Sequence, residues 1–338
     1  MGVPAKVGIV TKVKKRIVDT PRVAMLVITL FLALLFYIGI KTGGAGFPIN
    51  RLPWNILVPS AAGFCLLHSW HLLGRSRAIA LFLCATVISF CFEWVGETTG
   101  WPFSHYHYTD VLGWKIGGRV PALIPLAWYM MFYPSYIIAN LLAEGGPIPQ
   151  VGGKVRIIWL SLMSAAVMTA WDLTMDPVMS YRGPDPDKAI VDNPMADVGT
   201  PAWIWAENGA HFGVPLQNYF GWMLTAFTVF LIYRWLETKL EHAPKHGMCS
   251  RLMISMPIGI YTAMAVVDTF LGYPEIHGLR LISPFSMGIP AFFAAFQLFM
   301  NRTDLPFWPG EDHDHSHHPE RPGTGSVEVT ATHAEHGA

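Results

Sequence analysis

The chain has 338 residues, of which 52% are hydrophobic and only 14% are charged, and its mean hydropathy is +0.36. This composition is too apolar for an ordinary soluble domain and indicates a polytopic membrane protein. Because Lys plus Arg and Asp plus Glu both number 23, the formal net charge is zero. The chain therefore carries no basic footprint for nucleic acid or another polyanionic partner.

The chain starts with a basic segment, residues 1–22, and continues into the apolar run Val23–Ile40. We expect this run to be a retained first span, because no small-residue cleavage site follows it. Further runs have about the 20 residues needed to cross a bilayer: Trp54–Leu73, Ala78–Val95, Pro121–Ala143, Ile157–Met175, Gln217–Trp235, Leu252–Leu271 and Ile282–Met300. The sequence thus predicts an all-α helical bundle of about eight transmembrane helices over residues 23–301.

The distribution of Lys and Arg predicts the orientation of this bundle. With the amino terminus inside, the inner segments hold sixteen of these residues and the outer segments hold the remaining seven of the 23. Cytoplasmic segments are enriched in Lys and Arg, so we expect a multi-pass protein of the cell membrane with both termini in the cytoplasm. The basic segment 1–22 and the His-rich segment 302–338, a predicted disordered tail, would then both be cytoplasmic.

Two long connections, about 96–120 and 176–216, would lie on the non-cytoplasmic face. They are rich in Gly, Pro, Trp and Tyr and contain no long polar run, which favours structured caps over flexible tethers. We expect them to form a lid over one end of the bundle.

Two predicted spans end in pairs of acids, Glu93 with Glu97 and Asp172 with Asp176, and the span that follows begins near Asn218. In the predicted topology all five residues reach the same non-cytoplasmic end. Acids within membrane segments are costly and are functional candidates by default. Paired acids in a dry pocket can keep a proton at neutral pH, which suits general acid catalysis. Because Pro177 disfavours helical geometry at the preceding residue, the sequence leaves open whether Asp176 faces the same way as Asp172.

Aromatic residues are dense around these acids. They could form an interfacial belt. They could equally line a slot for a long apolar ligand whose transient positive charge the ring faces would stabilise. The candidate substrate-binding residues are Trp101, Tyr106, Tyr108, Trp128, Trp203, Trp205, Phe212 and Trp222.

Histidines offer a different interpretation of the acids. His105, His107 and His211 could join them in a di-metal site, since mixed carboxylate and imidazole ligands suit iron or manganese. The spans, however, contain no histidine-rich boxes at helical spacing, so we predict no metal and no cofactor. His68 and His71, three apart in a span, are expected to pack or snorkel.

Ordered motifs run through this part of the chain: Glu93-x-x-Gly96-x-x-x-Gly100-x-Pro102-Phe103-x-x-Tyr106-x-Tyr108, then Pro121 and Trp128, Asp172-x-x-x-Asp176-Pro177, Trp203-x-Trp205, and Phe212-Gly213-Val214-Pro215-x-x-Asn218-x-x-Gly221-Trp222. Together they resemble the membrane-integral carotenoid hydratases of the bisanhydrobacterioruberin hydratase and gamma-carotene hydratase type. The resemblance covers roughly residues 90 to 225. Ser104 departs from it, because a glycine is expected after Pro-Phe.

This resemblance implies that water is added across the terminal 1,2 double bond of an acyclic carotenoid end group, giving a tertiary alcohol without a redox cofactor. The bundle would be catalytic and would take its carotenoid from the bilayer, with other enzymes of the pathway as candidate partners. Asp172 or Glu93 would donate the proton. Asp176 and Glu97 would polarise or deliver water, which Asn218 would orient.

Alternative functions remain. A carotenoid cyclase would begin with the same protonation but trap the cation with a neighbouring double bond. A membrane prenyltransferase could use the Asp172-x-x-x-Asp176 spacing to hold magnesium and diphosphate, although few cations lie beside these acids in the sequence. A protein that only binds pigment or lipid would need the acids for structure alone.

Overall fold

The computed structural model describes residues 54–149, 153–182, 201–241, 251–270, 276 and 278–300. The predicted first span, the basic segment 1–22 and the tail 302–338 lie outside these ranges. Within them the chain is mostly helical, as predicted. Five helices are long and apolar enough to cross a membrane: Arg75–Thr99, Leu123–Glu144, Lys154–Met179, Arg251–Phe270 and Leu279–Met300.

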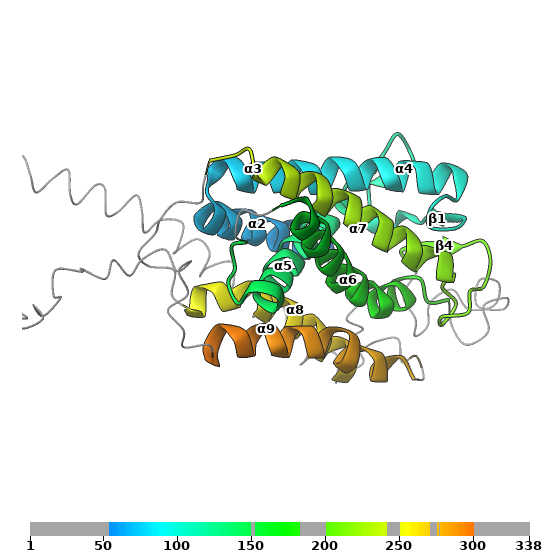
Figure 1. The fold of residues 1–338 in the computed structure, drawn as a ribbon. Helices are drawn as coiled ribbons and strands as arrows, with labels where there is room; N and C mark the ends of the chain where they lie inside the picture. The colour runs from blue at the N-terminus through cyan, green and yellow to red at the C-terminus, as the bar shows by residue number, and fades with distance from the viewer. Residues whose placement is uncertain are drawn as a thin grey trace, which may run out of the picture.

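Every predicted span inside the described ranges corresponds to a helix (Figure 1). The predicted total of about eight remains a prediction. In chain order the helices are α2 (Trp54–Leu73), α3 (Arg75–Leu83) continued by the π-helical turn η2 (Cys84–Ile88) into α4 (Ser89–Thr99), α5 (Leu123–Glu144), α6 (Lys154–Met179), α7 (Leu216–Glu237), α8 (Arg251–Phe270), and the short turns η4 (Leu279–Leu281) and η5 (Pro284–Gly288) leading into α9 (Ile289–Met300).

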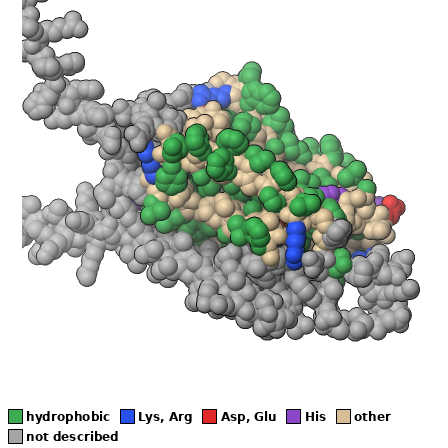
Figure 2. Space-filling model, turned by 90° about the horizontal axis from the view of Figure 1, so that it is seen from below, with side chains coloured by type: hydrophobic (Ala, Val, Ile, Leu, Met, Phe, Trp, Pro, Cys, Tyr) green, Lys and Arg blue, Asp and Glu red, His purple; other side chains and the backbone are tan. Residues whose placement is uncertain are grey.

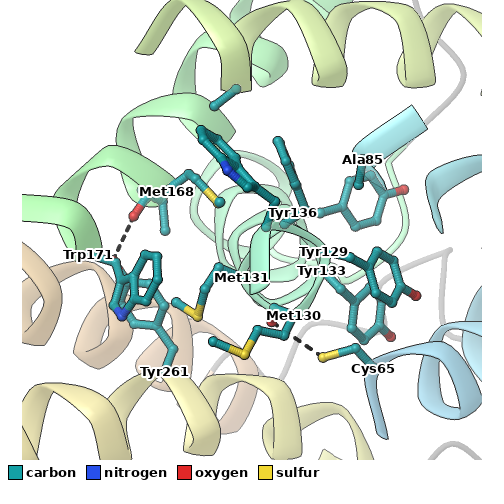
Figure 3. Close-up of a cluster of buried hydrophobic side chains, with 14 of the residues drawn as sticks. Cys65, Ala85, Tyr129, Met130, Met131, Tyr133, Tyr136, Met168, Trp171 and Tyr261 are labelled. Carbon is teal, nitrogen blue, oxygen red and sulfur yellow. Dashed lines mark hydrogen bonds between the residues drawn. The ribbon is translucent and has the colours of Figure 1, made fainter. Parts of the chain in front are cut away.

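Helix α5 forms the centre of the bundle. It packs against α2, α6, α8 and α9, and 78% of its apolar stretch is buried. Figure 3 shows Tyr129, Met130, Met131 and Tyr133 pointing from α5 in different directions into this core. A helix that is apolar on all sides is stable only when neighbours cover all of it, so the composition of α5 explains its central place.

The outer helices expose apolar side chains. Helix α9 presents Phe292, Phe293 and Phe296 outward, each at least half exposed. Figure 2 shows hydrophobic side chains over much of the described part of one face, with few charged ones among them. An apolar exterior of this kind suits a lipid environment, where it costs nothing to leave such side chains uncovered.

Prolines inside the helices leave backbone carbonyls without their usual partner, because proline has no N–H to donate four residues back. In α5, Pro134 frees the carbonyl of Met130, which accepts a hydrogen bond from the Cys65 thiol of α2 at 3.4 Å. Side chains of neighbouring helices can satisfy such carbonyls in an apolar environment. The buried Cys65 thereby links α2 to α5.

Helix α8 repeats this arrangement. Pro257 frees the carbonyl of Met253, which lies 2.8 Å from Nε2 of His68 in α2. The other ring nitrogen, Nδ1, lies 2.6 Å from the Tyr133 hydroxyl. Both nitrogens of His68 thus have structural partners, in keeping with the expectation that this histidine packs within the bundle.

Two small β ribbons in the connections were not predicted. Strand β1 (Tyr106–Tyr108) pairs antiparallel with β4 (Trp203–Trp205), and β2 (Lys115–Ile116) pairs with β3 (Val120–Pro121). A 3-10 turn, η3 (Asp110–Leu112), lies between β1 and β2. The β1–β4 ribbon joins the two long connections and lies beside the ends of α4 and α7 (Figure 1). The described parts of the two connections are therefore held together by this strand pairing.

Candidate active site

The β1–β4 ribbon presents four aromatic side chains on one face. Its register pairs Tyr106 with Trp205 and Tyr108 with Trp203. Side chains alternate along a strand, and cross-strand partners share a face, so these four point the same way. Their polar atoms all end on two buried carboxyl groups, those of Glu93 and Asp176.

Glu93, near the end of α4, accepts hydrogen bonds from three neutral donors. The Tyr108 hydroxyl donates to Oε2 at 2.7 Å, the Tyr106 hydroxyl donates to the same oxygen, and Trp128 Nε1 of α5 donates to Oε1 at 2.7 Å. Burial and the neighbouring Glu93 raise the pKa of Tyr106 and of Tyr108 well above their usual value. Both tyrosines therefore stay protonated donors at neutral pH.

Asp176, near the end of α6, also accepts hydrogen bonds from three neutral donors. Trp203 Nε1 lies 2.9 Å from Oδ1, and Trp205 Nε1 lies 3.2 Å from the same atom. The Asn218 side-chain amide of α7 donates to Oδ2 at 2.6 Å. Donors aimed at a carboxylate stabilise its charged form, so Glu93 and Asp176 are both equipped to hold a negative charge.

Asp172 differs from these two acids. Its side chain is buried, with 1% exposed, and its Oδ2 accepts one hydrogen bond, from the Asn218 amide at 3.0 Å. Within the part of the chain that the structure describes, its Oδ1 has no hydrogen-bond partner. Compared with Glu93 and Asp176, Asp172 is the least stabilised as an anion. Asp176 lies one helical turn further along α6 and shares the Asn218 amide with Asp172.

Pro177 does not break α6, which continues to Met179. The proline frees the carbonyl of Leu173, and Nε2 of His211 lies 2.8 Å from that oxygen. A carbonyl only accepts, so His211 donates this hydrogen bond. The helix keeps its geometry, and Asp172 and Asp176 share the face that meets Asn218. This settles the question that the sequence left open.

His211 was one of the three histidines considered for a di-metal site, but its Nε2 is used by the Leu173 carbonyl. His107 lies on β1 and is exposed, and His105 packs its ring against Gly100. Across the described ranges, no group of three or more His, Cys, Asp or Glu side chains is arranged to hold a metal ion. The carboxyl groups are joined instead through tryptophan, tyrosine and asparagine.

Aromatic packing surrounds the carboxyl groups. Trp128 stacks on Trp222 with ring centroids 3.9 Å apart. Phe103 fits between helices α4 and α7, because a Cβ at Gly96 or at Gly221 would come within 2.5 Å of its ring. These two glycines of the sequence motifs thus leave room for an aromatic ring between two helices.

Three predicted site residues lie elsewhere. Glu97 forms an ion pair with Arg119 at 2.7 Å and takes no part in the hydrogen bonds of Glu93. Trp101 is 53% exposed and stacks on Phe92. Phe212 is half-buried and packs edge-on to His211. The structure does not bring these three into the carboxyl network, because each contacts a residue outside it: Arg119, Phe92 of α4 and His211, respectively.

Ser104 occupies a position that favours glycine. Its φ is +93°, a region that side chains with a Cβ rarely adopt. Its N–H donates to the carbonyl of Gly100 at 2.6 Å, which closes the turn after α4. The departure from the motif is therefore accommodated, and the turn keeps its geometry with serine in place.

Sequence reasoning missed two polar groups at this end. Asp268 of α8 is buried and accepts a hydrogen bond from Thr174 at 3.0 Å. Its position in an apolar run was the available signal, the same one that drew attention to Asp172. The Tyr219 hydroxyl is buried without a hydrogen-bond partner among the described residues, and nothing in the sequence could have shown that.

The fold and the site define a helical membrane protein in which three carboxyl groups, those of Glu93, Asp172 and Asp176, accept hydrogen bonds from neutral aromatic and amide donors. The chain belongs to the carotenoid biosynthesis protein family, whose model matches residues 55–184 and 189–283. It is also similar to the bisanhydrobacterioruberin hydratase of Haloarcula japonica, with 28% identity over 163 residues. This match covers 48% of the chain and 46% of the relative, so the chain spans about half the length of the curated relative. No solved structure gives a significant match.

Proposed function

We propose that this protein hydrates the terminal 1,2 double bond of an acyclic carotenoid end group. Three lines support the proposal: membership of the carotenoid biosynthesis family, a relative named as a hydratase, and a buried acid able to supply a proton. The carotenoid would reach the site from the bilayer, because the helices that carry the acids and Asn218 expose apolar side chains such as Val95, Leu162 and Phe220.

The observation that carries the proposal is the unequal hydrogen bonding of the carboxyl groups. Glu93 and Asp176 each receive three donors, whereas Asp172 receives only one. Crowded acids in a dry site cannot all ionise together, and the proton stays on the one least stabilised as an anion. Asp172 is therefore the proton donor, with its proton on Oδ1, which has no partner among the described residues.

The reaction follows from this arrangement. Transfer of the Asp172 proton to the inner carbon of the double bond leaves a tertiary cation on the outer carbon. The ionised Glu93 and Asp176 and the faces of the surrounding aromatic rings stabilise this cation. A water molecule adds its oxygen to the cation and gives one proton back to a carboxylate. The balance is one alkene and one water to one tertiary alcohol, with no proton or electron consumed.

Expression of the full chain in a lycopene-accumulating host, followed by pigment analysis, tests the proposal. A hydratase yields a product heavier than lycopene by the mass of one water. A cyclase yields an isomer of unchanged mass, and a pigment-binding protein leaves lycopene unchanged. Either of the last two results would overturn the proposal. Activity that requires magnesium and a prenyl diphosphate would instead indicate a prenyltransferase.

We further propose that the end of the bundle that holds Glu93, Asp172 and Asp176 faces away from the cytoplasm. The amino and carboxyl termini of the chain would both be inside. The distribution of Lys and Arg supports this orientation. A membrane-impermeant amine reagent applied to intact cells should then label Lys115, whose side chain is partly exposed and pairs with Asp110, and should leave Lys154, at the start of α6, unlabelled. The reverse labelling pattern would invert the topology without changing the chemistry.

A further inference from the structure

The water that adds to the cation needs a binding group near the aspartates. A side-chain amide has two N–H donors on one nitrogen. The structure uses that nitrogen for both aspartates, at 3.0 Å from Asp172 Oδ2 and at 2.6 Å from Asp176 Oδ2. Asn218 thus uses both of its donors to hold the two acids in place. We treat it as a positioning residue.

Tyr219, the next residue of α7, has a free polar group in the same region. Its ring packs edge-on to His211 with centroids 5.1 Å apart, and His211 is hydrogen-bonded to the carbonyl of Leu173, the neighbour of Asp172. Its hydroxyl is buried and has no hydrogen-bond partner in the described ranges. Tyr219 directly follows Asn218, whose side chain hydrogen-bonds to both Asp172 and Asp176.

A buried hydroxyl without a partner is unusual, because leaving such a group unpaired is costly. Trp171, beside Asp172, also has a buried nitrogen without a partner in the described residues. An indole N–H can only donate, however, and a donor that occupies the lone pair of a water makes it a weaker nucleophile. A tyrosine hydroxyl both donates and accepts. It can therefore accept a hydrogen bond from water and leave the water oxygen free to react.

We propose, on the basis of the hydratase function above, that the Tyr219 hydroxyl is a catalytic residue that binds the nucleophilic water. It accepts a hydrogen bond from that water, which bridges the hydroxyl and the Asp172 carboxyl group. When the water oxygen bonds to the tertiary cation, the water gives one proton to the Asp172 carboxylate, which had given its proton to the alkene. Asp172 is thereby restored, and no external acid or base is consumed.

Loss of this hydroxyl should separate the two half-reactions. Without bound water, the cation formed by protonation loses a proton again and returns to the alkene. In deuterated buffer this reversal leaves deuterium in the recovered substrate. The assay uses membranes containing the full chain, added unlabelled lycopene and mass spectrometry of both product and recovered substrate.

In Tyr219→Phe we expect about a 10²-fold loss of hydrated product, the low end of the range for general acid–base catalysis, while deuterium in recovered lycopene rises above the wild-type level. Asp172→Asn should show neither hydration nor exchange. Tyr261→Phe is the matched control, because that hydroxyl is buried but donates to the Val167 carbonyl in the core. It should keep hydration without added exchange.

Two results would overturn the inference. Wild-type hydration by Tyr219→Phe would show that the hydroxyl is not needed. A parallel loss of hydration and exchange in Tyr219→Phe would show that the residue supports protonation or folding instead. If the wild-type protein neither hydrates nor exchanges, the proposed hydratase function itself fails, and this inference fails with it.

Discussion

Carboxyl groups are buried at both ends of the bundle, but their hydrogen-bond partners differ in charge. Near the ends of α4 and α6, the partners of Glu93 and Asp176 are neutral. At the end of α7, Glu237 forms an ion pair with Arg77 of α3 at 3.2 Å and accepts a hydrogen bond from Tyr136 at 2.6 Å.

The Glu237 end holds a second arginine. Arg234 donates to Asn140 at 2.9 Å and to Ser164 at 2.8 Å, and its guanidinium lies 4.7 Å from the centre of the Tyr136 ring. These contacts tie α3, α5, α6 and α7 together. Sixteen residues of α7 separate Asn218 from Arg234, about 24 Å along the helix, so the two clusters occupy opposite ends.

The charge of the hydrogen-bond partners distinguishes a buried acid with a structural role from one with a catalytic role. A cationic partner neutralises a carboxylate and fixes it in the charged form. Neutral donors orient a carboxyl group without neutralising it, so several such groups close together must share protons. The Glu237 cluster is accordingly structural, whereas the Asp172 cluster can exchange a proton with a substrate.

The largest effect should come from Asp172→Asn. Because this variant removes the proton donor and keeps the shape, we expect a loss of about 10²-fold to 10⁴-fold in conversion, the range for general acid catalysis. The thermal unfolding midpoint in detergent should change little. Conversion at the wild-type rate by correctly folded Asp172→Asn protein would remove Asp172 from the mechanism.

Glu237→Gln should do the opposite. It leaves Arg77 buried without its counter-charge, which costs about 3–5 kcal/mol in the free energy of unfolding. Hydration per folded molecule should be unchanged. The comparison requires unfolding curves and pigment yields normalised to folded protein. A stable Glu237→Gln variant with no activity would mean that the two ends do not divide their roles in this way.

His211→Phe should have a smaller effect, through the Leu173 carbonyl. Loss of its hydrogen-bond donor leaves a buried carbonyl unpaired, at about 1–3 kcal/mol. Adding Pro177→Ala returns a backbone N–H to that carbonyl and should recover much of the lost stability. If the double variant is no more stable than His211→Phe alone, the histidine has a different role, such as metal binding.

The smallest effect concerns pH. The folded-state pKa values of Tyr106 and Tyr108 are raised by burial and by Glu93, above an unfolded value of about 10. Their contribution to stability is therefore complete below pH about 10 and declines as the pH rises above it. Unfolding measured across this range should show the decline, and the double variant Tyr106→Phe, Tyr108→Phe should flatten it. Equal slopes in both proteins would contradict the assignment.

The sequence was sufficient to place the helices of the described ranges, since their apolar runs are long. It also singled out Glu93, Asp172, Asp176 and Asn218 as candidates, because polar residues at the ends of apolar helices are conspicuous. The sequence did not predict that the strand of Tyr106 and Tyr108 pairs with the strand of Trp203 and Trp205. That pairing links segments about a hundred residues apart, and local patterns carry no record of such a register.

Glu97 shows a second limit of sequence reasoning. Its spacing from Glu93 correctly places both on one side of α4, but α4 ends at Thr99. The Glu97 side chain therefore reaches the loop, where Arg119 pairs with it. Helical spacing predicts which residues share a face. It does not predict which loop residue will pack against a side chain near the end of the helix.

The most direct test of the central claim is the protonation state of Asp172 before substrate binds. Infrared difference spectra at neutral pH, taken as wild type minus Asp172→Asn, should contain the carbonyl band of a protonated carboxylic acid. The differences from Glu93→Gln and Asp176→Asn should contain carboxylate bands instead. A carboxylate band in the Asp172 difference would show that this acid has no proton to give, and the proposed mechanism would be wrong.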